Sequence, residues 1–134
     1  NRSNITPMLI PLNDENSLNF FNLKNIFVPG KSGHYFGDKD DKKENFGISG
    51  CKLDELILQK KIPFPNYIKI DVDGLENKVL SGMNTILENE KLKSILIEFA
   101  KVEEKNFYVE KLHKYGFKLI QGPTGNNRNY IFQK

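Results

Sequence analysis

The stretch that decides the fold is YIKIDVDGLENKVLSG, residues 67–82. Its first six residues are mostly apolar and partly β-branched, and turn-forming residues bound them on both sides, which predicts a buried strand. Apolar residues then recur at helical spacing over residues 75–87, which predicts a helix that begins at once. The strand therefore passes into the helix through an acidic turn that holds Asp71, Asp73 and Gly74.

Strands and helices keep alternating around this stretch. The other elements that we expect from residue 53 onward are a helix over 53–61, a strand over 92–99, a helix over 102–115, and strands over 117–120 and 129–132. Such an order is typical of parallel βαβ units, and continuous apolar strands are typical of a sheet covered on both faces. We therefore predict an α/β protein with a Rossmann-like, mostly parallel sheet that closes with an antiparallel hairpin.

The first 52 residues predict a less regular region. We expect a hairpin from residues 8–12 and 18–23, an extension of the sheet at Phe27 and Val28, a long polar loop over 29–45, and a strand over 46–52. The whole chain, 1–134, is then a single partial domain. It consists of this strand, hairpin and loop region (1–52) and a βαβαββ C-terminal half (53–134).

Composition narrows the class of protein. The chain has 134 residues and a net charge of +3, and its lysines are spread out rather than gathered in the basic stripe of a nucleic-acid-binding protein. No apolar run approaches the ~20 residues that span a membrane. The lone Cys51 excludes an intrachain disulfide and fits a reducing compartment, so we expect a cytoplasmic protein. The two histidines lie too far apart in sequence for metal-ligand spacing, and no metal site is predicted.

Two acidic residues end successive predicted strands. Asp71 follows the strand that begins at residue 67, and Glu98 lies at the end of the next one. Ligands in open α/β sheets bind beyond the carboxyl ends of the strands, and acids there cost solvation free energy unless they are paired. If the two strands are neighbours, Asp71 and Glu98 open into one cleft, and we predict that they act there.

The other polar residues of interest allow more than one interpretation. Asp73 precedes the predicted helix and is either a helix cap or a ligand for a substrate, and Glu76 in the first helical turn has the same simple capping role. Gly74 suits a tight turn with positive φ. His34 lies beside two aromatic residues in the predicted loop, where it is either a general base or a residue without a function.

The stretch at 67–82 resembles the signature of the FkbM methyltransferases, in which a strand KIDVEG is followed by E and then by VL-x-G on the next helix. Here Asp73 stands in place of the usual Glu. Weaker resemblances follow in the same order along the chain: PLND at 11–14, CKLDEL at 51–56, LIE at 96–98, and YGF at 115–117 followed by NYIF at 129–132.

The resemblance implies a class I methyltransferase fold. It implies transfer of a methyl group from S-adenosylmethionine to a hydroxyl oxygen of a sugar, glycan or secondary metabolite. By this resemblance Asp71 and Glu98 are the catalytic residues that position or deprotonate the acceptor. Asn13, Asp14 and Asp71 would bind the cofactor. From their positions in the loop and the turn, and not from the resemblance, we expect Asp73, Gly74 and His34 to bind the acceptor.

One departure from the family is large. In the family's fold, a Gly-rich turn after the first strand and an acid at the end of the second strand bind the cofactor. Neither feature precedes Met8 in this sequence. We therefore expect the N-terminal part of the domain to be missing from these 134 residues and the chain alone to bind S-adenosylmethionine weakly or not at all.

Two rival interpretations remain. Residues 71–73 read DVD, which resembles the DxD motif of Mn²⁺-dependent glycosyltransferases, and hard cations prefer such oxygen ligands. The chain could instead be an inactive α/β remnant or an interaction module. The sequence leaves the oligomeric state open.

Overall fold

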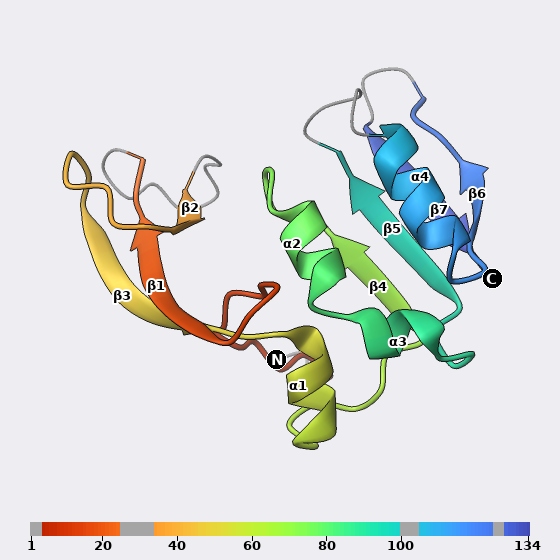
Figure 1. Ribbon diagram of the computed structural model, residues 1–134, viewed down its shortest axis with the longest axis horizontal. Coiled ribbons are helices and arrows are strands. Elements are labelled where there is room, and N and C mark those ends of the chain that lie inside the picture. The colour runs from red at the N-terminus through yellow and green to blue at the C-terminus, as the bar shows by residue number, and fades with distance from the viewer. Residues whose placement is uncertain (1–3, 25–33, 100–104, 125–127) are drawn as a thin grey trace.

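A computed structural model describes residues 4–24, 34–99, 105–124 and 128–134. The N-terminal elements are β1 (Ser17–Asn22), β2 (Tyr35–Gly37), β3 (Asn45–Gly50) and α1 (Leu53–Leu58). They are followed by β4 (Tyr67–Ile70), α2 (Glu76–Ser81), α3 (Asn84–Glu88), β5 (Ser94–Glu98), α4 (Lys105–His113), β6 (Lys118–Gln121) and β7 (Asn129–Gln133). The strands form two sheets, which Figure 1 shows on either side of α2.

The first sheet is antiparallel, with the order β2-β1-β3. Phe21 lies at its centre, opposite Phe36 on β2 and Phe46 on β3. The hairpin that we predicted between residues 8–12 and 18–23 is wrong, because β1 pairs with β2 and β3 instead. β2 lies within the predicted loop, and Phe27 and Val28 lie outside the described residues.

The segment before β1 joins the fold through its backbone. Leu12 forms an isolated parallel bridge with Cys51. The Asn13 amide donates to the Cys51 carbonyl at 2.9 Å, and the Cys51 amide donates to the Pro11 carbonyl at 3.0 Å. Residues 8–12 therefore run beside the end of β3 without forming a strand of their own.

The second sheet has the order β4-β5-β7-β6. β4 and β5 are parallel, whereas β7 is antiparallel to both β5 and β6. The α/β class and the closing hairpin are as predicted, but a mostly parallel sheet is not confirmed: of the strand pairs described in the two sheets, only β4–β5 is parallel. The sequence pattern did not reveal that the last strand inserts between β5 and β6.

The main core lies on one face of the second sheet. Ile70, Ile97 and Tyr130 occupy one row across β4, β5 and β7, and all three are buried. Figure 1 shows α2 and α4 over the same face of this sheet. The strands alternate between buried and partly exposed residues, with Tyr67 75% exposed on β4, so the prediction of a sheet covered on both faces is not confirmed in the described part of the chain.

The helix predicted over residues 75–87 is broken into α2 and α3 at Gly82. A Cβ atom on Gly82 would lie 2.0 Å from the Asn13 carbonyl oxygen, so only glycine lets the two backbones approach this closely. The carboxylate of Asp54, at the start of α1, accepts hydrogen bonds from the amides of Thr85 and Ile86 at 2.9 and 3.0 Å. These bonds satisfy free amides in the first turn of α3, which stabilises a new helix start there.

Candidate functional site

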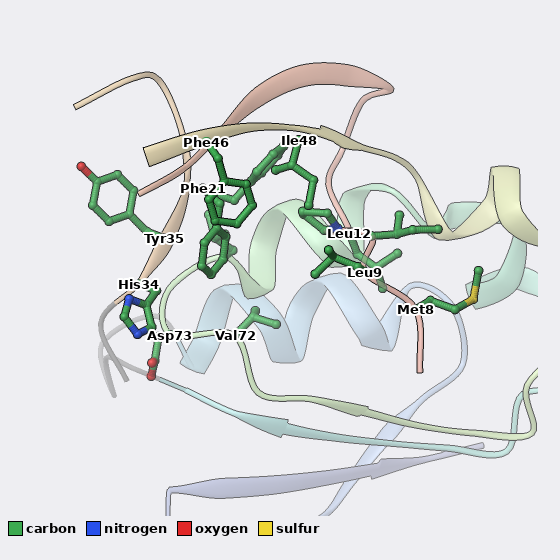
Figure 2. A pocket seen from close by; sticks show the side chains of 14 residues that line it. Met8, Leu9, Leu12, Phe21, His34, Tyr35, Phe46, Ile48, Val72 and Asp73 are labelled. Carbon is green, nitrogen blue, oxygen red and sulfur yellow. The ribbon is translucent and has the colours of Figure 1, made fainter. Parts of the chain in front are cut away.

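A cavity of about 340 Å³ lies between the first sheet and the turn that joins β4 to α2. Figure 2 shows Phe21 and Phe46, from the first sheet, facing Val72 across it. The residues that line the cavity are Met8, Leu9, Ile10, Pro11, Leu12, Phe21, His34, Tyr35, Phe36, Phe46, Ile48, Val72, Asp73 and Leu75. Three chain regions therefore build one largely apolar cavity that also contains a carboxylate and an imidazole.

The β4–α2 turn presents Asp73 to this cavity. Asp73 has a φ of +50° and Gly74 a φ of +103°, so two successive residues adopt the left-handed conformation. The buried Glu76 stabilises the turn, because its carboxylate accepts a hydrogen bond from the Gly74 amide at 3.1 Å. The structure confirms the positive φ expected at Gly74. The capping alternative for Asp73 is wrong, because α2 begins after Leu75 and has no side-chain cap.

The Asp73 carboxylate is available for chemistry. Within the described part of the chain it has neither a hydrogen-bond nor an ion-pair partner, and the residue is exposed. A non-glycine residue with positive φ costs of order 1–3 kcal/mol, although Asp tolerates this region better than most residues. Such strain is typical of functional sites, where it aims a side chain.

His34 lies at the same end of the cavity as Asp73, as Figure 2 shows. Its Nδ1 atom accepts a hydrogen bond from the Lys24 amide at 3.2 Å. Because Nδ1 is an acceptor, the neutral ring carries its proton on Nε2 and can donate from that atom. This arrangement suits His34 to orient an oxygen atom better than to take a proton from it.

Asp71 and Glu98 lie at the same end of the second sheet, as expected for neighbouring strands. Ile70 pairs with Ile97, which brings the residues that follow them to the same level of the sheet. Each acid has a cationic partner: Lys69 Nζ is 2.8 Å from Asp71 Oδ2, and Arg128 Nη2 is 3.3 Å from Glu98 Oε1. Neither acid lines the cavity.

The charges at this end of the sheet are coupled. The hydrogen bond to Asp71, and then its negative charge, raise the pKa of Lys69, and the charge of Glu98 adds to this effect. The ammonium group therefore stays protonated beside both acids. The pair of acids is a partly neutralised charge cluster at the sheet end rather than two free bases.

The remaining predicted site residues lie elsewhere. Asn13 is 1% exposed, and its backbone packs under Gly82. Among the residues that the structure describes, its side-chain Oδ1 and Nδ2 have no hydrogen-bond partner. Asp14 lies within electrostatic range of Lys111 on α4. Gly82 and Gly74 flank opposite ends of α2, a helix of six residues and roughly 9 Å in length. The structure thus does not bring Asn13 together with Asp73.

Lys111, the charged neighbour of Asp14, bonds to residues of α2. Its ammonium donates to Ser81 Oγ at 2.7 Å and lies 3.4 Å from Asn77 Oδ1, which ties α4 to α2. Burial lowers the pKa of Lys111, and the charge of Asp14 opposes that shift. Asp14 therefore lies within electrostatic range of the Lys111 ammonium and does not line the cavity.

Gly74 lines a different depression, of about 420 Å³, between α2 and α4. The structure therefore places His34 and Asp73 in one cavity, Asp71 and Glu98 at the adjoining sheet end, and Gly74 in the turn between them. The cavity walls at residues 8–12, Phe46 and Val72 were not predicted as site residues. The sequence held one indication of these walls. Val72 is an apolar residue between two acids, Asp71 and Asp73, in a turn where an apolar side chain is unexpected.

Cys51 does not enter the site. It is half-buried, and burial, with a smaller contribution from the charge of Glu55, raises the pKa of its thiol. A raised pKa favours the unreactive protonated form, in agreement with a packing role.

Two further features are absent from the described ranges. No group of three or more His, Cys, Asp or Glu residues there could hold a metal ion. No helix in the same ranges is long and apolar enough to cross a membrane.

Comparison with known proteins gave one match. The family model described as the Methyltransferase FkbM domain matches residues 8–119. No curated protein and no solved structure matches the chain. The matched range includes the β4–α2 turn, residues 8–12 and the whole first sheet, and so includes every described residue that lines the cavity.

Proposed function

The chain belongs to the FkbM methyltransferase family, and we propose that it is an S-adenosylmethionine-dependent O-methyltransferase that acts on a hydroxyl group of a sugar, glycan or secondary metabolite. The observation that carries this proposal is the Asp73 carboxylate, which lines an apolar cavity without a partner in the described chain. A hydroxyl acceptor needs both a site that positions it and a base that removes its proton.

Asp73 is the residue that we assign as this base. Its carboxylate would take the proton of the acceptor hydroxyl as the oxygen gains its methyl group. His34 lies at the same end of the cavity and would help to orient the acceptor there. The apolar walls would exclude water, which strengthens these electrostatic interactions.

The cofactor would supply an electrophilic methyl group. The two carboxylates at the ends of β4 and β5 suit this cofactor. Asp71 and Glu98 can accept hydrogen bonds from ribose hydroxyls or lie near a sulfonium charge. Asn13 and Asp14 do not share that location, so we no longer place the adenine end of the cofactor beside them. We therefore propose Asp71 and Glu98 as contacts of the cofactor, and not as the base.

The direct test is methyl transfer by the protein at its full encoded length. With S-adenosylmethionine carrying a tritiated methyl group and a panel of hydroxyl acceptors, we expect labelled methyl ethers, identified by mass spectrometry. The variant Asp71→Asn should lose most of this activity. Full turnover by Asp71→Asn would show that Asp71 has no part in the reaction.

The glycosyltransferase rival predicts Mn²⁺-dependent sugar transfer from a nucleotide sugar. The structure does not favour it, because the Lys69 ammonium already lies on Asp71, the first acid of the DVD sequence. Sugar transfer without methylation in the same panel would establish the rival and reject the methyltransferase. We place the reaction in the cytoplasm on the ground that a chain with a lone cysteine fits a reducing compartment.

A further inference from the structure

The apolar side chains that the described chain leaves exposed are not scattered evenly. Of the ten large apolar residues that are exposed within the described ranges, four line the cavity: Met8, Leu9, Phe46 and Val72. Their exposed fractions are 43%, 83%, 44% and 37%. A gathering of this kind marks a surface that binds something, whereas single exposed apolar residues are ordinary.

One wall of the cavity is aromatic. The ring centroids of Phe21 and Phe46 are 5.5 Å apart, and those of Phe21 and His34 are 6.0 Å apart. Both pairs are tilted, a geometry in which a further ring can add edge-on or offset. In Figure 2 the two phenylalanines lie across the cavity from Val72, so one wall is aromatic and the opposite one is aliphatic.

Few polar side chains line the cavity. Of the described lining residues, the ones with polar side chains are His34, Tyr35 and Asp73. The Tyr35 hydroxyl is already engaged, since it donates to Asp40 Oδ2 at 2.8 Å. A plain sugar brings several hydroxyls into such a site, and each one that is buried without a partner costs about 1–3 kcal/mol. The inside of the cavity therefore suits an apolar group such as a ring, with a hydroxyl placed at the end that holds Asp73 and His34.

The size of the cavity agrees with such a ligand. A volume of about 340 Å³ is at the small end of the ~300–1,000 Å³ typical of ligand sites. It equals roughly eleven water molecules at ~30 Å³ each. A single substituted ring fits in that space, whereas a folded partner does not.

From these observations we propose that the cavity binds an aromatic ring of the acceptor, so that the methylated hydroxyl belongs to an aryl alcohol or an aryl glycoside and not to a plain sugar. This inference rests on the proposed function and narrows its substrate class. The ring lies between Phe46 and Val72, and the hydroxyl faces Asp73.

Binding without the cofactor tests the inference. The probes are phenyl β-D-glucopyranoside and methyl β-D-glucopyranoside, which carry the same sugar hydroxyls and differ only in the aglycone. We expect the protein at its full encoded length to bind the phenyl compound about tenfold more tightly in ligand-observed NMR titrations, because a ring contributes through aromatic contact. Equal affinity for the two glucosides, or no binding of either, would overturn the inference.

Two variants locate the ring. Phe46→Ala should weaken binding of the phenyl compound about tenfold, to the level of the methyl compound. Phe46→Leu keeps the bulk of the side chain and should lose part of that preference. The matched control is Phe107→Ala, because Phe107 is 52% exposed on α4 and does not line the cavity. If Phe46→Ala and Phe107→Ala behave alike, the ring does not bind where we place it.

Activity separates this inference from the proposed function. Faster methylation of the phenyl than of the methyl glucoside supports both. Equal methylation of the two compounds leaves the methyltransferase intact and overturns the ring site. Ring binding combined with sugar transfer and no methylation rejects the methyltransferase instead. A second copy of the chain that closes the cavity would show as dimerisation in ultracentrifugation with loss of phenyl glucoside binding, and that result would also overturn the proposal.

Discussion

The two sheets of this protein differ sharply in how they bury apolar surface. The second sheet and its helices contain Leu80, Met83, Ile95 and Ile97, each 0% exposed. In the first sheet, Phe36, at 6% exposed, is the buried apolar residue of the described strands, and Leu18 is 75% exposed. The second sheet therefore supplies most of the stability, while the first sheet keeps aromatic side chains at the cavity.

The two regions meet at a few close contacts. Asn13 packs under Gly82, where a Cβ atom would lie 2.0 Å from the Asn13 carbonyl oxygen, and Val72 of the β4–α2 turn lines the same cavity as Phe21 of β1. Local stability follows local burial, so the first sheet should open more readily than the second. A cavity between a deeply buried layer and a thinner one can admit a ligand without disturbing the main core.

The largest expected effect compares the same substitution in the two regions. Phe132→Ala removes a ring that is 1% exposed, and we expect it to lower the free energy of unfolding by about 3–5 kcal/mol. Phe46→Ala removes a ring that is 44% exposed and should cost about 1 kcal/mol. Urea unfolding of the two variants measures the difference. Equal losses would break the comparison, because the first sheet would then be as tightly packed as the second.

The next effect concerns the junction of the two regions. Gly82→Ala places a methyl group against the main chain of Asn13, which cannot rotate away, and should cost about 1–3 kcal/mol or prevent folding. The control is Gly37→Ala, since no atom lies within 4 Å of its Cβ position, and it should change the free energy of unfolding by no more than about 0.5 kcal/mol. If thermal unfolding shows the two variants to be alike, the regions do not meet as described.

A smaller effect is expected in the turn that carries Asp73. Gly74→Ala meets no atom within 4 Å, so its cost comes only from the φ of +103° and should be about 1 kcal/mol. Gly122→Ala is the control, because its surroundings are equally open and its φ is not in the left-handed region. Chemical denaturation of both variants checks this. An unchanged Gly74→Ala would show that the turn is not strained.

The smallest effect is a pH dependence within the first sheet. The hydrogen bond from Tyr35 lowers the pKa of Asp40 below its ordinary value of 3.8. Because the pKa is lower in the folded state, the contribution to stability is present above about pH 3.8 and is lost as the pH falls through the folded pKa. In Tyr35→Phe, NMR titration should show the Asp40 pKa moving up toward 3.8. No change in that pKa would mean that the hydrogen bond does not form in solution.

Local patterns in the sequence predicted much of the second sheet. The run at 67–72 and the acids that follow it led correctly to β4, to a neighbouring parallel β5, and to Asp71 and Glu98 at one sheet end. The positive φ of Gly74 was also predictable, because glycine adopts this conformation without a steric cost. These features are determined by residues that are close together in sequence, so the periodicity of a single helix or strand is enough to predict them.

The missed features depend on residues far apart in sequence. The break between α2 and α3 requires Asn13 and Asp54, which no helical pattern at 75–87 can reveal. The register of β1 is set by β2 and β3 rather than by its nearest apolar run. The cavity walls come from three separate regions, so Asp73 looked like a helix cap until the structure placed it among them.

The central claim is that Asp73 acts as the base in a cavity between the two regions. Its most direct measurement is the kcat of methyl transfer for Asp73→Asn in the protein at its full encoded length, with Asp41→Asn, an exposed acid in the turn after β2, as control. Asn also tolerates positive φ, so the turn should persist. The account predicts a fall in kcat of about 10²–10⁴ for Asp73→Asn with unfolding unchanged, and near-normal turnover for Asp41→Asn. Undiminished kcat in Asp73→Asn would contradict it.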